Sequence, residues 1–268
     1  MMKIKGVIFD WAGTIVDFGS LAPMGAFVEL FSRHGINITI AEARVPMGLP
    51  KIDHILALGQ MPTVASTWES LHGRKFTSQD AHDLLLEFEP MSAAAAIQRS
   101  DFVPGFLPVY SQLKAQGMRF ATTTGYTRKI MLPVIEKSQT LGFEPALVVC
   151  CDDVLRSRPD PMGIEACLKA MNLEGHARQV IKVDDTAPGL AEGLAAGCWT
   201  VGVAASGNAL GWSHEQWLAA SDSEKIQALL PAVNLLKTAG AHEVVDSVAD
   251  LPMAIARIEH RIAQGESP

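Results

Sequence analysis

Side chains that could carry out phosphoryl transfer follow short apolar runs at four places in the sequence. In chain order these are Asp10, residues 122–125, Arg158, and the pair Asp184 and Asp185. A carboxylate can attack phosphorus, hydroxyl and amide groups with a guanidinium can hold phosphoryl oxygens, and further carboxylates can bind a hard cation. Together these groups suit a reaction that passes through an aspartyl-phosphate.

Each of these groups taken alone also has an ordinary structural explanation. An aspartate after a strand often forms a turn or caps a helix. The aspartate pair could lie in a solvated loop, and Arg158 could be a surface residue beside Pro159. The order is harder to explain by chance, because each group stands at the end of its own run or in the loop that follows. The set therefore favours a catalytic site.

The apolar runs that must position these groups are typical of buried parallel strands. They cover residues 6–9, 119–122, 146–150, 180–183 and 199–203. Helical patterns separate them, which predicts an α/β fold with a doubly wound, mainly parallel sheet. In such sheets ligands bind outside the carboxyl ends of the strands, where the polar groups described above would meet.

A long stretch between the first two runs is predicted to contain only helices. Thr39 with Glu42 forms a capping-box pattern, and no strand pattern interrupts residues 20–100. About 80 residues of helix exceed one crossover connection, so we expect an inserted helical cap. The predicted domains are a core of residues 1–19 and 101–268 and a cap of residues 20–100.

Further helix signals and the late part of the chain complete this outline. Pro50 is placed as a first helical residue, Gly59 and Gly73 as helix stops, and Thr77 as a further helix start. Residues 207–268, with a helical run to Ala263, are expected to close the core and carry no recognisable chemistry.

The composition indicates a globular protein that acts on a small molecule. Of 268 residues, 48% are apolar and 19% are charged, and the net charge of -7 argues against attraction to nucleic acid or anionic membranes. No signal peptide or membrane-spanning run is evident, so we expect a soluble cytoplasmic protein. The four cysteines form no CxxC pair and are expected to be reduced.

The combined order of motifs resembles the haloacid dehalogenase superfamily. The matching elements are a strand with Asp-x-Ala-Gly-Thr, a strand with Thr-Thr-Gly, an Arg-Pro pair, a strand with Asp-Asp-Thr, and the helical insertion. The resemblance implies a Rossmann-like core and an Mg²⁺ cofactor. It also implies these site residues: Asp10 as nucleophile, the Ala12 carbonyl and Asp185 on the metal with Asp184 as a further candidate, Thr124 and Gly125 on phosphoryl oxygens, and Arg158 in place of the usual lysine.

Besides Arg158, two further positions depart from the superfamily pattern. Phosphatases and mutases of the superfamily carry a second aspartate two residues after the nucleophile, and Ala12 stands there instead. Alanine cannot protonate a leaving oxygen, so an alkoxide leaving group lacks its general acid. Gly189 also replaces an acidic residue often found four positions after the metal-binding aspartate, which leaves the details of metal coordination open.

A lysine in the predicted cap could supply what a carbon leaving group needs. Expelling a carbanion from phosphorus requires an electron sink, and an iminium nitrogen beside that carbon provides one. Lys51 lies in the first turn of the helix predicted to start at Pro50, where the helix dipole and burial would lower its pKa. The ordinary alternative is a solvated surface lysine. Because Ala12 supplies no acid for an oxygen leaving group, we favour imine formation as the role of Lys51.

The segments around these residues also resemble the phosphonoacetaldehyde hydrolase family, whose members cleave a carbon–phosphorus bond. The resemblance rests on residues 10–14, residues 47–51, and residues 124–128. It implies that Lys51 forms a Schiff base with the aldehyde of a small phosphonate substrate. It implies further site residues: Met47 beside the imine, Gly48 in the substrate site, and His54 and Tyr126 organising water. Met47 and His54 could equally be packing residues.

Two other functions remain open on the sequence alone. One is a capped phosphatase or phosphosugar mutase of the same superfamily, against which Ala12 speaks. The other is a non-catalytic binding module of the same fold, against which Asp10, Arg158 and Asp185 speak. The family resemblance and the predicted cap helices also make a homodimer the expected assembly.

Overall fold

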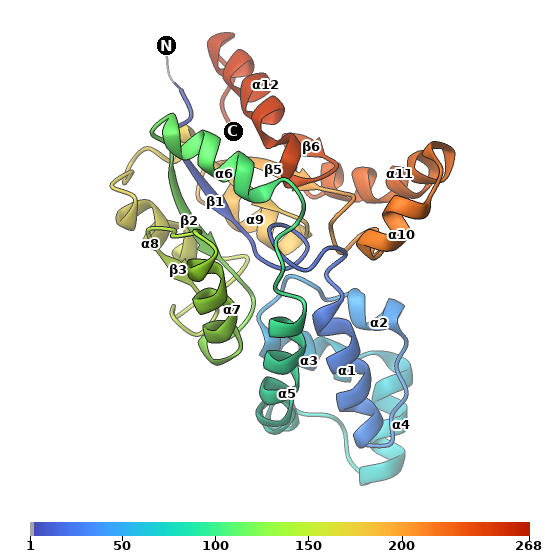
Figure 1. The fold of residues 1–268 in the computed structure, drawn as a ribbon. Helices are drawn as coiled ribbons and strands as arrows, with labels where there is room; N and C mark the ends of the chain where they lie inside the picture. The colour runs from blue at the N-terminus through green and yellow to red at the C-terminus, as the bar shows by residue number, and fades with distance from the viewer. Residues whose placement is uncertain (1–2) are drawn as a thin grey trace.

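The computed structural model describes residues 3–268 and contains a six-stranded parallel sheet. The strand order is β3-β2-β1-β4-β5-β6 (Figure 1). The strands are β1 (Gly6–Phe9), β2 (Arg119–Thr123), β3 (Val148–Val149), β4 (Val180–Asp184), β5 (Trp199–Val203) and β6 (Glu243–Val245). Phe9 pairs with Thr122 on one side and with Val183 on the other, so β1, β2 and β4 end at the same edge. The predicted α/β parallel sheet is confirmed.

Strand β1 at the centre of the sheet is apolar on both faces because helices cover both faces. Val7 and Phe9 belong to a core cluster that includes Phe106 and Ile258, whereas Ile8 packs in a second cluster with Ile164. This alternation follows the two-residue period of a strand. The helices of the core are α6 (Phe106–Ala115), α7 (Arg128–Thr140), α8 (Met162–Ala170), α9 (Ala187–Ala195), α10 (His214–Ala219), α11 (Asp222–Thr238) and α12 (Leu251–Ala263).

The stretch between β1 and β2 forms helices only, as the sequence predicts. They are α1 (Ala22–Arg33), α2 (Ile40–Arg44), α3 (Lys51–Gly59), α4 (Pro62–His72) and α5 (Ser78–Gln98). They lie together beyond the carboxyl-terminal edge of the sheet (Figure 1). Capping boxes at Thr39 and Thr77 start α2 and α5, and Gly73 ends α4 in a left-handed conformation. The division into domains at residues 20 and 100 stays a prediction.

Two local details differ from the sequence expectation. Pro50 has an extended backbone and precedes α3, so the helix begins at Lys51 rather than at the proline. Strand β6 is not predicted from the sequence, because its three residues at the sheet edge, two of them only partly buried, are too few to give a periodic pattern. Strand β3 has two residues rather than the predicted five, since only Val148 and Val149 pair with β2.

A half-buried arginine joins the helical insert to the core. Arg44, at the end of α2, donates from Nη1 to the carbonyl oxygens of Gly19 and Asn208 at 3.1 and 3.2 Å, and to Asn208 Oδ1 at 2.9 Å. Its Nη2 donates to the Gly211 carbonyl at 3.3 Å. The Asn208 amide donates in turn to Asp185 Oδ2 at 2.7 Å. Arg44 therefore links the insert to the loop that holds a predicted site residue.

None of the helices in residues 3–268 is long and apolar enough to cross a bilayer. The four cysteines are free, and three of them, Cys150, Cys167 and Cys198, are buried.

We expect Arg44→Ala to lower the free energy of unfolding by about 1–3 kcal/mol, because core carbonyl groups lose their donor. Chemical denaturation monitored by circular dichroism measures this change. Arg33→Ala is the control, since its ion pair with Glu29 is exposed and should matter by no more than about 0.5 kcal/mol. Equal effects of the two variants would contradict a specific link through Arg44.

Candidate active site

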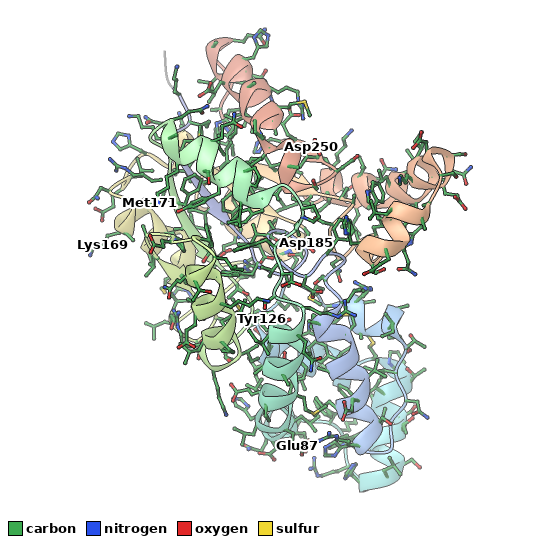
Figure 2. The ribbon with its side chains drawn as sticks, viewed as in Figure 1. Glu87, Tyr126, Lys169, Met171, Asp185 and Asp250 are labelled. Atoms are coloured by element: carbon green, nitrogen blue, oxygen red, sulfur yellow. The ribbon has the colours of Figure 1, made fainter. Side chains whose placement is uncertain are left out.

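A pocket at the carboxyl-terminal edge of the sheet brings together most of the predicted site residues. Figure 2 labels Tyr126 and Asp185 in this region, between the sheet and the helical insert. The predicted residues that line the pocket are Asp10, Ala12, Met47, Gly48, Lys51, Thr124, Gly125, Tyr126, Arg158 and Asp185. Ser20, Pro23 and Thr186 complete the lining. Residues far apart in the sequence therefore meet as the parallel topology requires.

Two glycines allow the insert to approach the core at this pocket. Gly48 has φ +93°, and a Cβ atom there would lie 2.3 Å from Thr186 Oγ1. A Cβ atom on Gly125 would lie 2.6 Å from the carbonyl oxygen of Leu49. These distances are too short for any other residue type. The loop that carries Met47 and leads into α3 can close over the strand ends because both positions are glycine.

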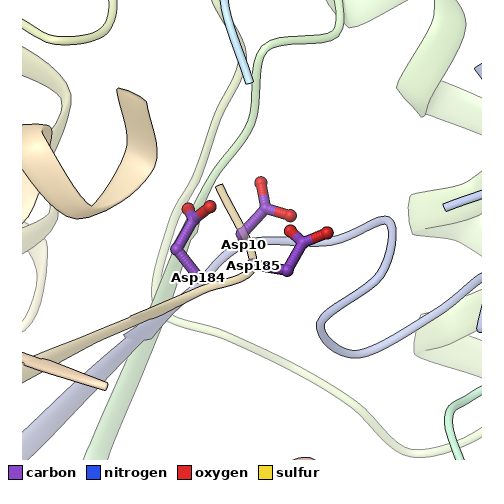
Figure 3. A group of neighbouring side chains, drawn as sticks. All are labelled: Asp10, Asp184 and Asp185. Carbon is purple, nitrogen blue, oxygen red and sulfur yellow. The ribbon is translucent and has the colours of Figure 1, made fainter. Parts of the chain in front are cut away.

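Three aspartates form a buried acidic cluster at the floor of the pocket. Carboxylate oxygens of Asp10, Asp184 and Asp185 lie within 4.8 Å of one another (Figure 3). Burial, and then the charge of Asp184, raise the pKa of Asp10 to about 6. Burial and the charge of Asp10 raise the pKa of Asp185 well above its usual value. Burial and mutual repulsion therefore disfavour a negative charge on Asp10 and Asp185 at the same time.

A buried arginine pairs with the predicted nucleophile. Arg158 Nη2 lies 2.9 Å from Asp10 Oδ1 and 3.4 Å from Asp184 Oδ2. The same nitrogen donates to the carbonyl oxygen and the hydroxyl of Thr123 at 2.8 and 2.9 Å. These charge-assisted contacts fix the guanidinium beside the carboxylate. Arg158 can hold both Asp10 and a phosphoryl group that Asp10 attacks.

The two neighbouring aspartates have different surroundings. Both oxygens of Asp184 face protein donors: Oδ1 accepts from the Thr186 amide and hydroxyl, and Oδ2 lies 3.0 Å from Lys182 Nζ. Although burial opposes ionisation, Lys182 and Arg158 lower the pKa of Asp184 below its usual value. Asp185 accepts hydrogen bonds from the Asn208 amide and the Thr14 hydroxyl, but it forms no ion pair among residues 3–268. Because Asp185 also lines the pocket, its carboxylate is the better placed of the two for a cation.

The amine of Lys51 is buried in an aromatic setting. The residue is 3% exposed, and Nζ lies 4.5 Å from the centre of the Tyr126 ring and 5.7 Å from that of Phe27. No carboxylate forms an ion pair with it among residues 3–268. Burial therefore lowers the pKa of Lys51 to about 8, despite the opposing charges of Cys151 and Asp10. A substantial fraction of the amine is neutral near physiological pH.

His54 is the predicted catalytic residue that the structure places outside the pocket lining. It is fully buried, its ring stacks on Phe27 with centroids 3.9 Å apart, and Nε2 lies 2.9 Å from the Ala43 carbonyl. Burial and the charge of Lys51 lower its pKa well below the usual value. The His54 ring therefore packs on Phe27 and contacts the Ala43 carbonyl, and its catalytic role stays a prediction. Met47, in contrast, is 8% exposed and lines the pocket.

Two buried charged residues beside the site are not among those predicted from the sequence. Lys182 lies within strand β4 and Glu192 within helix α9, and both are almost fully buried. Lys182 could have been noticed, because a lysine inside an apolar strand is rarely buried without a partner. Nothing in the sequence marks Glu192, whose partners come from distant segments.

Comparison with known proteins identifies the family. Residues 4–197 match the model of the haloacid dehalogenase-like hydrolases. The chain is 45% identical over 268 residues to a phosphonoacetaldehyde hydrolase from Paraburkholderia phytofirmans, with all of both chains covered. It is 41% identical over 270 residues to one from Salmonella typhi, again with full coverage.

Solved structures agree with this result. A phosphonoacetaldehyde hydrolase-like protein from Oleispira antarctica superposes with a TM-score of 0.96 at 42% identity, covering 99% of this chain and 96% of that one. A β-phosphoglucomutase from Clostridium difficile superposes with a TM-score of 0.67 at 16% identity, covering 97% of this chain and 99% of that one. The second similarity concerns the fold alone.

We expect the reactivity of Lys51 toward a small acetylating reagent to rise with pH and to reach half its maximum near pH 8. Only the neutral amine is nucleophilic, and burial lowers the pKa of Lys51 to about 8. Mass spectrometry of the peptide that contains Lys51 measures the rate, and Lys51→Arg removes the signal. Half-maximal reaction above pH 10 would contradict a buried, unpaired amine.

Proposed function

The chain belongs to the haloacid dehalogenase-like hydrolases, and on this premise we propose that it hydrolyses phosphonoacetaldehyde to acetaldehyde and phosphate. The observation that carries this proposal is one pocket lined by Asp10, Ala12 and Lys51. The pocket holds a nucleophile for phosphorus and an amine for an aldehyde, and it lacks the acid that an alkoxide leaving group needs.

The reaction begins on the carbon side of the substrate. The neutral amine of Lys51 adds to the aldehyde carbon, and loss of water gives a protonated imine. Tyr126, whose ring lies against Nζ, stabilises the resulting cation. Met47 and Gly48 line the same side of the pocket and confine the imine. The low pKa of Lys51 makes the first step possible near neutral pH.

Cleavage of the carbon–phosphorus bond follows. Asp10 attacks phosphorus and forms an aspartyl-phosphate, and the electron pair of the broken bond moves toward the iminium nitrogen to give an enamine. Arg158, with Thr124 and Gly125, holds the phosphoryl oxygens. Protonation of the enamine carbon and hydrolysis of the imine release acetaldehyde. Water then cleaves the aspartyl-phosphate, releasing phosphate and restoring Asp10.

The acidic cluster fits a magnesium ion. The ion would be held by Asp10, Asp185 and the Ala12 carbonyl, which offer only oxygen ligands. The pKa values of Asp10 and Asp185 are raised, and a bound cation would lower both. Bound Mg²⁺ would neutralise charge on the phosphoryl oxygens. Asp184 instead keeps Lys182 and Thr186 in place. This assignment chooses Asp185 over Asp184 as the direct ligand.

We assign His54 a supporting role rather than a catalytic one. His54 supports the α3 helix behind Lys51 and does not touch the reacting atoms. The cytoplasmic location and the homodimer remain predictions, which cell fractionation and light scattering can test.

A phosphatase or mutase activity is the main alternative, and it would require a leaving-group acid that Ala12 does not provide.

We expect borohydride with phosphonoacetaldehyde to label Lys51 and to inactivate the enzyme, because reduction traps the imine. Peptide mass spectrometry locates the adduct. Lys51→Arg should lower turnover by about 10³-fold or more, since arginine keeps the charge but forms no imine. Exposed Lys129→Arg is the matched control and should be labelled and active like the wild type. Labelling of another lysine, or of none in active enzyme, would contradict the proposal.

We expect Asp185→Asn to weaken Mg²⁺ binding by about tenfold or more, and Asp184→Asn to weaken it less but to lower the melting temperature. The reason is that Asp185 offers oxygens to the pocket, whereas Asp184 neutralises Lys182. Titration calorimetry with Mg²⁺ alone measures the affinity. A greater loss of Mg²⁺ affinity in Asp184→Asn would reverse the assignment of the two aspartates.

A further inference from the structure

A second set of charged side chains lies behind the pocket and does not line it. Lys182 Nζ lies 2.8 Å from Thr123 Oγ1, 3.0 Å from Asp184 Oδ2 and 3.7 Å from Glu192 Oε2. The Thr123 hydroxyl also lies 2.8 Å from Glu192 Oε2. Lys182 and Glu192 are 0% and 2% exposed. The two opposite charges are therefore held in the interior by specific contacts.

Neighbouring glycines leave room for these two side chains. A Cβ atom on Gly163 would lie 2.7 Å from Glu192 Oε1, and one on Gly193 would lie 2.6 Å from Lys182 Cβ. Both glycines are in helices, where glycine destabilises by about 0.5–1 kcal/mol relative to alanine. Burial of an ion pair also brings little net stability compared with apolar residues of the same size. Stability alone does not explain the arrangement.

The arrangement fixes the plane of the Arg158 guanidinium. Glu192 Oε2 lies 3.1 Å from Arg158 Nε. Thr123, which Lys182 and Glu192 both contact, accepts from Nη2 of the same guanidinium. Because the guanidinium is planar, the contacts of Glu192 at Nε and of Thr123 at Nη2 together fix its plane, and with it the direction in which Nη2 meets Asp10.

We propose that Glu192 and Lys182 are positioning residues that hold Arg158 for the phosphoryl half of the reaction. Glu192 acts on Nε, and Lys182 acts by holding Thr123 and Asp184, the other partners of the guanidinium. This inference rests on the proposed function of Arg158 as a phosphoryl-binding residue. Neither residue touches the substrate, so both act through Arg158.

Glu192→Gln tests the proposal without removing a large side chain. We expect it to raise the dissociation constant of inorganic phosphate by about tenfold, because the neutral amide no longer orients Nε. Titration calorimetry of the Mg²⁺-loaded protein measures this. Trapping of the product acetaldehyde on Lys51 by borohydride should change by less than about twofold, since acetaldehyde carries no phosphoryl group. Glu165→Gln, exposed on α8, is the matched control.

The double variant Lys182→Met with Glu192→Gln separates positioning from stability. It removes the charges of both Lys182 and Glu192, and Asp184 keeps Arg158 Nη2 at 3.4 Å as a charged partner. We therefore expect it to fold and still to bind phosphate about tenfold more weakly than the wild type. Wild-type phosphate affinity in Glu192→Gln or in the double variant would overturn the proposal. So would a parallel loss of acetaldehyde trapping, which would indicate general disruption.

These readouts also separate this inference from the proposed function. Phosphate binding requires no turnover, so it reports on Arg158 even if phosphonoacetaldehyde is not cleaved. Failure of the wild type to release acetaldehyde and phosphate would contradict the proposed function alone. Normal wild-type turnover with unchanged phosphate binding in Glu192→Gln would contradict the positioning role alone.

Discussion

The buried contact between Arg158 and Asp10 is the interaction on which the rest of the site depends. It joins the end of β1 to the loop after β3, two segments about 150 residues apart, at an N–O distance of 2.9 Å. Only a parallel sheet whose strands end at one edge brings these groups together. The contact offsets part of the charge repulsion from Asp184 and Asp185, and it leaves the guanidinium beside the carboxylate that we propose attacks phosphorus.

The helical insert contributes the residue that suits this phosphoryl-transfer site to a carbon leaving group rather than an oxygen leaving group. The core supplies Asp10 and Arg158, while the loop before α3 brings Lys51 against Tyr126, where burial keeps part of the amine neutral. Gly48 and Gly125 allow this close approach. Ala12 removes the acid that an oxygen leaving group needs. The same pocket thus favours carbon–phosphorus cleavage through the combination of an absent carboxylate and an added amine.

The sequence predicted the strands that carry the site because each has a strong apolar run, and it predicted the insert because its capping patterns at Thr39 and Thr77 are local signals. It could not locate β6, whose pairing depends on β5 rather than on a pattern of its own. It left His54 undecided, because only the packing on Phe27 shows which way the ring points. It missed Glu192 because the partners of that carboxylate are distant in the chain.

Single-turnover reaction of phosphonoacetaldehyde with wild-type protein and Lys51→Arg, with acetaldehyde and phosphate counted in the same samples, tests the central claim most directly. The account predicts one acetaldehyde for each phosphate from the wild type, and almost none of either product from the variant on the same timescale. Release of phosphate by Lys51→Arg at the wild-type rate would contradict an imine at Lys51 as the electron sink for carbon–phosphorus cleavage.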